Sequence, residues 1–158
     1  MNDCCCPPPH SQPERRCPRC RTRGVPVHEA TLKALLTERA MRRFEHGIYH
    51  FCPNASCQVV YFAEQGAAFV ISDVRVPAWQ KQPFGDRMIC YCFGETEGAI
   101  RDEIRQHGRS AAVDRIRAHI RAKRCACELR NPRGACCLRD VAAAVSRVEE
   151  HIEDRAAR

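Results

Sequence analysis

Thirteen cysteines stand in this chain of 158 residues, and most of them come in close pairs. The first two pairs are Cys17-Pro-Arg-Cys20 and Cys52-Pro-Asn-Ala-Ser-Cys57. A tight turn presents both thiolates of a pair on one side, and two such pairs provide the tetrahedral sulfur set of structural zinc. We therefore predict a zinc site on these four cysteines. A redox dithiol at Cys17 and Cys20 is the alternative, although such a motif normally follows a strand. Three histidines are substitute ligands: His10, His28 and His50.

A second group of thiols lies in the C-terminal half. It begins with Cys90-Tyr-Cys92 and continues, after a helical stretch, with Cys125, Cys127, Cys136 and Cys137. Both parts stand just before a predicted helix, whose first backbone N–H groups favour a bound anion. Arginines surround the downstream thiols, and a 2Fe-2S cluster on four thiolates is anionic. The pattern favours a 2Fe-2S cluster, with a second zinc as the alternative.

The composition favours metal ligands over disulfides. The N-terminus has no apolar stretch behind a basic start, and no run approaches the roughly 18 to 20 apolar residues of a membrane span. We expect a cytoplasmic protein that is not inserted in a membrane, in a compartment that keeps thiols reduced. The net charge of +7 is uneven, because residues 51–100 hold three Arg/Lys against five Asp/Glu. No single basic face follows, so nucleic acid is the less favoured partner.

The elements that must position these thiols divide the chain into four parts. Residues 1–16 read as a polar, proline-rich tail, 17–79 as a zinc-binding α/β portion, 80–87 as a linker and 88–158 as a helical domain. Segments 47–52, 57–63 and 67–76 are β-branched and aromatic, which predicts a small antiparallel sheet. Leu32, Leu35 and Leu36 have helical spacing behind Thr31, a candidate N-cap.

The C-terminal part has purely helical periodicity. Thr96 is expected to cap a helix that ends at His107-Gly108, and Ser110 a second one. The last helix carries an apolar stripe that predicts packing against the two preceding helices, with coiled-coil dimerisation as the alternative. The inward residues of the three helices are Ile100, Ile104, Val113, Ile116, Ile120, Leu138, Val141, Val145, Val148 and Ile152.

Two stretches, CYCFGETEGAI and KRCACELRNPRGACCLRDV, resemble the iron-sulfur and zinc N-terminal domain of CopZ-type copper chaperones. CPRC, TLKALL and IYHFCPNASCQVVYF resemble its zinc-binding portion, so the resemblance covers residues 15 to 142. A more distant similarity is to bacterioferritin-associated ferredoxin. The resemblance implies an α+β fold: a zinc ribbon-like antiparallel portion with a short helix, then a helical 2Fe-2S domain. It also implies cluster ligation by Cys90 and Cys92 on one side and by Cys127 and Cys137 on the other, with Cys125 and Cys136 as alternates.

The chain departs from the chaperones in one respect, because it ends without the copper-carrying domain and its Met-x-Cys-x-x-Cys loop. A candidate for picking up a soft ion is the run Cys4, Cys5 and Cys6, which three prolines keep extended. Adjacent thiols of this kind transfer Cu(I) or Hg(II) by ligand exchange; an incidental tail is the alternative.

The leading hypothesis is a cytoplasmic metallochaperone or redox accessory that handles copper or mercury, as in metal resistance. Its cluster would supply one electron, its zinc would be structural, and its partners would be a metal-transport or electron-donor protein. The sequence holds no catalytic triad, phosphate loop or HExxH motif, so no catalytic residue is assigned. Two alternatives stay open: a ferredoxin-like electron-transfer partner, and a zinc ribbon nucleic-acid regulator with a sensor cluster.

Overall fold

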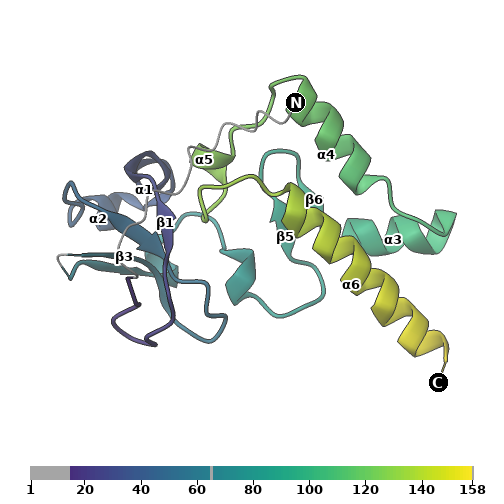
Figure 1. Cartoon of the computed structure of the whole chain (residues 1–158), viewed down its shortest axis with the longest axis horizontal. Coiled ribbons are helices and arrows are strands. Elements are labelled where there is room, and N and C mark those ends of the chain that lie inside the picture. Colours follow the sequence, from purple (N-terminus) through teal and green to yellow (C-terminus); the bar gives the residue numbers. More distant parts are fainter. Residues whose placement is uncertain (1–14, 65, 158) are drawn as a thin grey trace.

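A computed structural model describes residues 15–64 and 66–157 of the chain. Two groups of elements follow each other along this part: a four-stranded sheet with two short helices, then four helices with a two-stranded ribbon. Figure 1 shows the sheet with α1 and α2 on one side of the molecule and α3, α4 and α6 on the other. The predicted α+β class, with an antiparallel sheet and several helices, is confirmed.

The larger sheet is antiparallel throughout, with its strands in sequence order. Every residue of the two central strands is buried, which suits the β-branched and aromatic residues that fill them. The expected strands over 47–52 and 57–63 are therefore confirmed in shorter form. A further strand, which the sequence did not suggest, contains only three residues, and one of them is a proline. The four strands are β1 (Val25–Val27), β2 (Tyr49–Phe51), β3 (Val59–Ala63) and β4 (Ala68–Val70).

The strand expected over 67–76 ends early, at Val70, and a 3-10 turn η1 (Ile71–Asp73) follows it. Asp73 explains the ending, because its Oδ2 accepts a hydrogen bond from the Val70 N–H at 2.9 Å and pairs with Arg43 at 2.8 Å. A carboxylate that bonds the nearby backbone in this way competes with the sheet hydrogen bonds.

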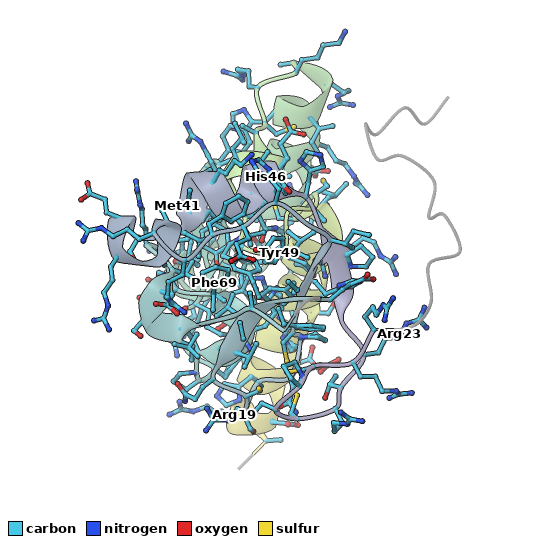
Figure 2. All side chains as sticks on the ribbon, turned by 90° about the vertical axis from the view of Figure 1, so that its left-hand side faces the viewer. Arg19, Arg23, Met41, His46, Tyr49 and Phe69 are labelled. Carbon is cyan, nitrogen blue, oxygen red and sulfur yellow. The ribbon has the colours of Figure 1, made fainter. Side chains whose placement is uncertain are left out.

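Two helices cover the sheet: α1 (Glu29–Leu35) and α2 (Glu38–Met41). Leu32 and Leu36 pack into the same core as Tyr49 and Phe69. Figure 2 shows Tyr49 and Phe69 among the side chains of this half, and Arg19 near its lower edge. The N-terminal half thus builds one apolar core between its helices and its sheet.

The prediction that Thr31 caps this helix was wrong. His28 is the N-cap, and its Nδ1 accepts a hydrogen bond from the Ala30 N–H at 3.2 Å. Thr31 lies inside α1 and is fully buried. Its hydroxyl donates to the Glu128 carbonyl at 2.6 Å, so the residue serves a contact 97 positions away instead of a cap.

The C-terminal half begins with a ribbon of β5 (Met88–Cys90) and β6 (Glu95–Thr96). Thr96 caps α3 as expected, and Gly108 ends that helix with φ +74°. Ala111 stands at the N-cap position of the next helix, while Ser110 Oγ accepts from the Ala112 N–H at 3.2 Å. The helices are α3 (Glu97–His107), α4 (Ala112–Arg121), α5 (Cys127–Arg130) and α6 (Leu138–Ala156).

The long helix α6 packs against α3 and α4. Val141 and Val148 of its apolar stripe are buried, together with Ile100 and Ile116 of the partner helices. The predicted packing of the stripe is therefore confirmed. Over the two described ranges, no helix has both the length and the apolar character that a membrane crossing requires.

The segment between the halves contains a 3-10 turn, η2 (Trp79–Lys81). Trp79 packs against the core of the C-terminal half. Further along, the Gly85 N–H donates to Glu97 Oε2 at 3.1 Å, which ties the predicted linker 80–87 to the start of α3.

Candidate metal centres

The first thiol site joins two turns of the N-terminal half. Cys17 and Cys20 lie on a turn closed by a hydrogen bond from the Arg21 N–H to the Cys17 carbonyl at 2.9 Å. Arg21 has φ +62°, which lets the chain reverse there. Cys52 directly follows β2, and Cys57 precedes β3. The sheet therefore brings the two pairs together.

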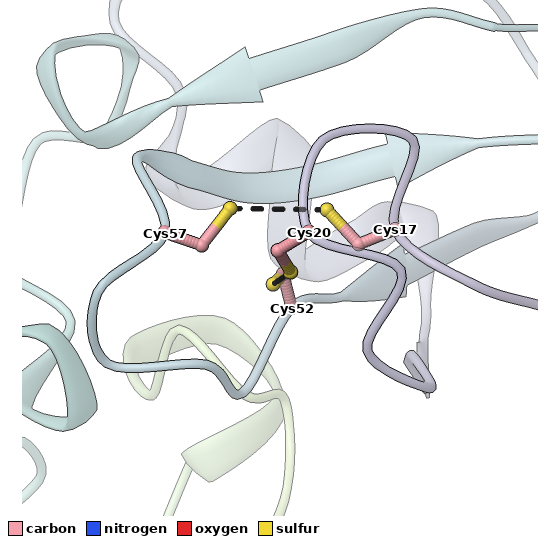
Figure 3. Close-up of side chains that lie close together, drawn as sticks. All are labelled: Cys17, Cys20, Cys52 and Cys57. Carbon is pink, nitrogen blue, oxygen red and sulfur yellow. Dashed lines mark hydrogen bonds between the residues drawn. The ribbon is translucent and has the colours of Figure 1, made fainter.

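The four sulfurs of this site have the spacing of a tetrahedral zinc ion. Zinc–sulfur bonds of about 2.3 Å require sulfurs about 3.8 Å apart in a regular tetrahedron. Cys17 Sγ lies 3.9 Å from Cys57 Sγ, and Cys20 Sγ lies 3.5 Å from Cys52 Sγ, as Figure 3 shows. All four atoms lie within 4.8 Å of one another. Among the described residues, this is the one group of three or more His, Cys, Asp or Glu that meets this spacing.

The protonation of these thiols also suits a cation. Burial raises the pKa of Cys20, but hydrogen bonds from Thr22 and from the thiols of Cys52 and Cys17 outweigh it and lower the pKa to about 6. Burial raises the pKa of Cys52 and of Cys57. Zinc binds thiolates, so a divalent cation supplies the positive charge that the buried thiols need to ionise.

Neither of the two candidate histidines in the described part of the chain belongs to this group of sulfurs. His28 caps α1, and His10 lies outside the described residues. His50 is 2% exposed and stacks on Phe62, with 5.5 Å between ring centroids. Within the described part of the chain, the ligand set of the first site therefore contains four cysteines and no histidine.

The second thiol site is built from the turn after β5 and from both ends of the α5 loop. Cys92 Sγ lies 3.8 Å from Cys127 Sγ and accepts a hydrogen bond from the Ala126 N–H at 3.4 Å. Cys137 is buried, and the neighbouring thiols of Cys127 and Cys90 raise its pKa. The contact between Cys92 and Cys127 therefore joins the upstream turn to the downstream loop.

The remaining two downstream thiols differ in their exposure. Cys125 is exposed, whereas Cys137 is 2% exposed. Cys136 is half-buried and its thiol reaches Cys127. The tail thiols Cys4, Cys5 and Cys6 lie outside the described residues.

Close packing shifts the pKa values of the thiols at the second site in opposite directions. A hydrogen bond from Cys137 lowers the pKa of Cys127 to about 6 and also lowers the pKa of Cys90. The same thiols raise the pKa of Cys137, and burial raises the pKa of Cys92 to about 12. The neighbouring thiols thus favour ionisation of Cys127 and Cys90 and oppose it at Cys137.

The surroundings of the second site are basic. Cys137 is the N-cap of the 19-residue helix α6, whose positive dipole end faces the site. Arg133 pairs with Asp140 at 3.1 Å. The other basic side chains near the site in sequence are exposed to solvent: Arg121, Lys123, Arg124, Arg130 and Arg139.

Two polar residues beside these sites carried no signal in the sequence. Lys81 Nζ donates to the Asn54 carbonyl at 2.9 Å and to the Cys57 carbonyl at 3.0 Å, within the ligand loop of the first site. Tyr61 is fully buried, and its hydroxyl donates to the Pro132 carbonyl at 2.8 Å, within the ligand loop of the second. A single lysine and a strand tyrosine do not reveal such contacts without the fold.

Comparison with known proteins agrees with this architecture. Residues 14–75 match a CopZ-type family model described as a zinc binding domain. The copper chaperone CopZ of Archaeoglobus fulgidus is 32% identical over 122 residues, which cover 77% of this chain. The chain spans 57% of the length of that relative.

The solved structure of the Archaeoglobus fulgidus CopZ N-terminal domain is similar in fold. The TM-score is 0.68 at 29% identity, and the match covers 82% of this chain and 96% of that domain. The resemblance to CopZ-type chaperones is therefore confirmed at the level of homology and of the zinc-binding portion. Residues 14–75 thus match the CopZ-type zinc binding domain, and the chain as a whole is similar in sequence and fold to the N-terminal part of the copper chaperone CopZ.

Proposed function

We propose that this protein handles copper with two metal centres: structural zinc at the first thiol site and a 2Fe-2S cluster at the second. The observation that carries the proposal is the set of four sulfurs at the first site together with the contact of Cys92 with Cys127 at a second site, in a chain similar to CopZ. The proposed cargo is a soft ion, copper or mercury, in the cytoplasm. Its proposed partners are a metal-transport protein and an electron donor.

The zinc at the first site would be held by Cys17, Cys20, Cys52 and Cys57, and its role would be structural. Three of these cysteines are buried in a small cluster with Val59 and Phe62. Such a cluster is too small to stabilise two turns by itself, so a metal that ties them together replaces the missing core.

The thiols of the second site fit a two-iron centre better than a single ion. A single tetrahedral ion needs all four sulfurs close to one another, whereas a 2Fe-2S cluster takes four thiolates in two pairs. The proposed ligands are Cys90 and Cys92 on one side of the cluster and Cys127 and Cys137 on the other, and the contact of Cys92 with Cys127 at 3.8 Å supports a site that draws on both segments. Cys125 and Cys136 remain the alternates.

This chain would supply the surroundings of the centre. The N-terminus of α6 and the Ala126 N–H, which donates to Cys92 Sγ, favour negative charge on the ligands. Phe93 stacks on His119, with 3.9 Å between centroids, beside the ligand turn. When bound, a 2Fe-2S cluster supplies one-electron transfer, and one electron converts Cu(II) into the Cu(I) that thiolates prefer.

Anaerobic purification followed by iron, sulfide and zinc analysis tests both centres. We expect two irons, two sulfides and one zinc per chain, with the visible absorption of a cluster. Cys127→Ser and Cys137→Ser should lose the cluster and keep the zinc. The matched variants Cys125→Ser and Cys136→Ser should keep both. A colourless wild-type protein without sulfide would refute the cluster.

A second experiment separates copper handling from electron transfer alone. Replacing Cys4, Cys5 and Cys6 together by Ser should abolish uptake of Cu(I) beyond the two metal centres. The cluster spectrum should stay unchanged, because these residues are not among the proposed ligands. Undiminished Cu(I) uptake would refute the tail as the uptake site, and a wild-type protein that takes up no Cu(I) beyond the two centres would favour the ferredoxin-like electron carrier.

A further inference from the structure

Both ligand-bearing segments of the second thiol site are connected to the first half of the molecule. The downstream segment contacts β3 and α1 directly, and the upstream segment contacts the η2 turn, which in turn contacts the ligand loop of the first site. We propose that the first site positions the second, so that the metal held at the first site controls how firmly the second retains its cluster. This inference rests on the proposed function, and it names Lys81, Tyr91 and Tyr61 as positioning residues.

The downstream ligand loop, residues 127–137, lies on the N-terminal half. Tyr61 of β3 donates to the Pro132 carbonyl at 2.8 Å, and neither residue is exposed. Thr31 of α1 donates to the Glu128 carbonyl at 2.6 Å. Gly134 comes so close that a Cβ there would lie 2.8 Å from Thr31 Oγ1. Figure 1 shows the result, with α5 beside α1 and separate from the other helices.

The upstream ligand turn, residues 90–92, is attached to the first site through η2. The Tyr91 hydroxyl donates to the Pro77 carbonyl at 2.6 Å and accepts from the Trp79 N–H at 2.9 Å. Two residues after Trp79, Lys81 donates to both carbonyls of the ligand loop at Asn54 and Cys57. A three-residue turn therefore connects the thiol loop of one site with the tyrosine between two thiols of the other.

Metal at the first site would fix the acceptors of Lys81. Four thiolates around a divalent ion leave a net negative charge, which the ammonium of Lys81 offsets through its two carbonyl contacts. Without metal, the loop 52–57 and the η2 turn gain conformational freedom, and the cluster ligands at 90–92 become less preorganised. Linkage makes the coupling reciprocal between the two sites.

Lys81→Met tests the connection, with Lys33→Met as the matched control. Both lysines lie over a phenylalanine ring, Lys81 at 5.8 Å from Phe51 and Lys33 at 5.4 Å from Phe44. Of these two lysines, Lys81 contacts a ligand loop, whereas Lys33 pairs with Glu29. The readouts are the rate of zinc release to a colorimetric chelator and the rate of bleaching of the visible band by an iron chelator.

We expect Lys81→Met to speed zinc release by about tenfold, as for other groups that orient metal ligands. Bleaching should also accelerate, by about 2- to 12-fold, the effect of one hydrogen bond. Lys33→Met should change neither rate. If Lys81→Met does not fold, Lys81→Gln removes the charge with a shorter side chain and serves the same comparison.

Tyr91→Phe shows whether the effect travels through η2. In that background, adding Lys81→Met should change bleaching less than it does in the wild type, because both changes break one path. Fully additive effects on bleaching would contradict the path.

Tyr61→Phe has its own control in Tyr49→Phe. Both hydroxyls are buried and donate to a carbonyl at 2.8 Å, but Tyr49 bonds Glu45 of its own half. A merely structural role predicts equal effects of the two variants on bleaching. Positioning predicts faster bleaching, with a changed visible circular dichroism spectrum, for Tyr61→Phe alone.

The failures of the two proposals are distinguishable. A wild-type protein without iron and sulfide refutes the proposed function. A wild-type protein with both centres, in which Lys81→Met speeds zinc release and leaves bleaching at the wild-type rate, refutes the coupling alone.

Discussion

Glu97 is a fully buried carboxylate at the first turn of α3, and its replacement by Gln should destabilise the fold. Its oxygens accept from both ends of the Arg87 guanidinium and from the backbone N–H groups of Gly85 and Arg87. Arg147 Nη2 lies 3.8 Å away. Gln keeps the volume but leaves two arginines without a counter-charge in a buried site.

The expected loss in the free energy of unfolding is about 3 kcal/mol. Removing one partner of a buried ion pair costs about 3–5 kcal/mol, and the Gln carbonyl still accepts from Arg87, which places the loss at the lower end. Urea slopes of about 2 kcal/mol per M turn this loss into a fall of about 1.5 M in the denaturation midpoint. Far-UV circular dichroism of the metal-loaded protein at pH 7 measures it.

Asp102→Asn is the control on the same helix. Its carboxylate is 62% exposed and lies 4.0 Å from Arg101, so the urea midpoint should stay at the wild-type value. Equal shifts for Glu97→Gln and Asp102→Asn would refute the reasoning from burial.

The pH dependence gives Glu97 a second check. Burial raises the pKa of Glu97, but Arg87 and the backbone N–H groups outweigh burial and hold the pKa below its ordinary value of 4.5. Because the folded pKa is depressed, the stabilisation is present above pH 4.5 and is lost as the pH falls through the folded value. The difference between wild type and Glu97→Gln should therefore shrink in acid.

Three further changes test separate features of the fold. Gly134→Ala adds a Cβ at 2.8 Å from Thr31 Oγ1 at φ +66°, whereas Gly108→Ala meets nothing within 4 Å at φ +74°. Both substitutions should lower the free energy of unfolding by about 1–2 kcal/mol because of the left-handed backbone. Gly134→Ala should lower it further because of the close contact, as urea denaturation will measure. Thr96→Ala removes the cap that accepts from the Ala99 N–H at 3.0 Å; a loss of about 1 kcal/mol should lower the thermal midpoint by about 2–4 °C, and an unchanged midpoint would contradict the cap. A hydrogen bond from Arg115 is the main reason that the pKa of Glu103 is lowered to about 2. The stabilisation of the fold by this ion pair should therefore be lost as the pH falls from 4.5 to 2. Calorimetry should show the wild type converging on Glu103→Gln over that range, and a constant gap would exclude the ion pair as its source.

Local chemistry made much of the fold predictable. The paired spacing of Cys17, Cys20, Cys52 and Cys57 needs only two tight turns to present four sulfurs, and the structure brings these sulfurs together. Thr96 and Gly108 bound α3 as expected, because capping depends on side chains within a few residues of the helix end.

Long-range contacts account for what the sequence did not reveal. Thr31 has the appearance of a cap, but its hydroxyl bonds a carbonyl of α5. The helix α5 has four residues, too few for any periodicity, and it lies against α1. Asp73 shortens a strand that its apolar neighbours would extend. For Thr31 and α5 the deciding partner lies far away in the sequence, whereas Asp73 acts on Val70, only three residues away.

The order of the thiols along the chain implies an order in which the two sites form during synthesis, with the surface that bears Tyr61 first. The last cysteine of the first site, Cys57, and the whole four-stranded sheet precede residue 71, whereas the second site is complete only at Cys137. Chains fold from the N-terminus as they leave the ribosome. The surface that receives the downstream loop is therefore made before that loop is synthesised. The four thiols of the first site are thus in place before the second set is complete, which limits the pairing of a cysteine with the wrong site.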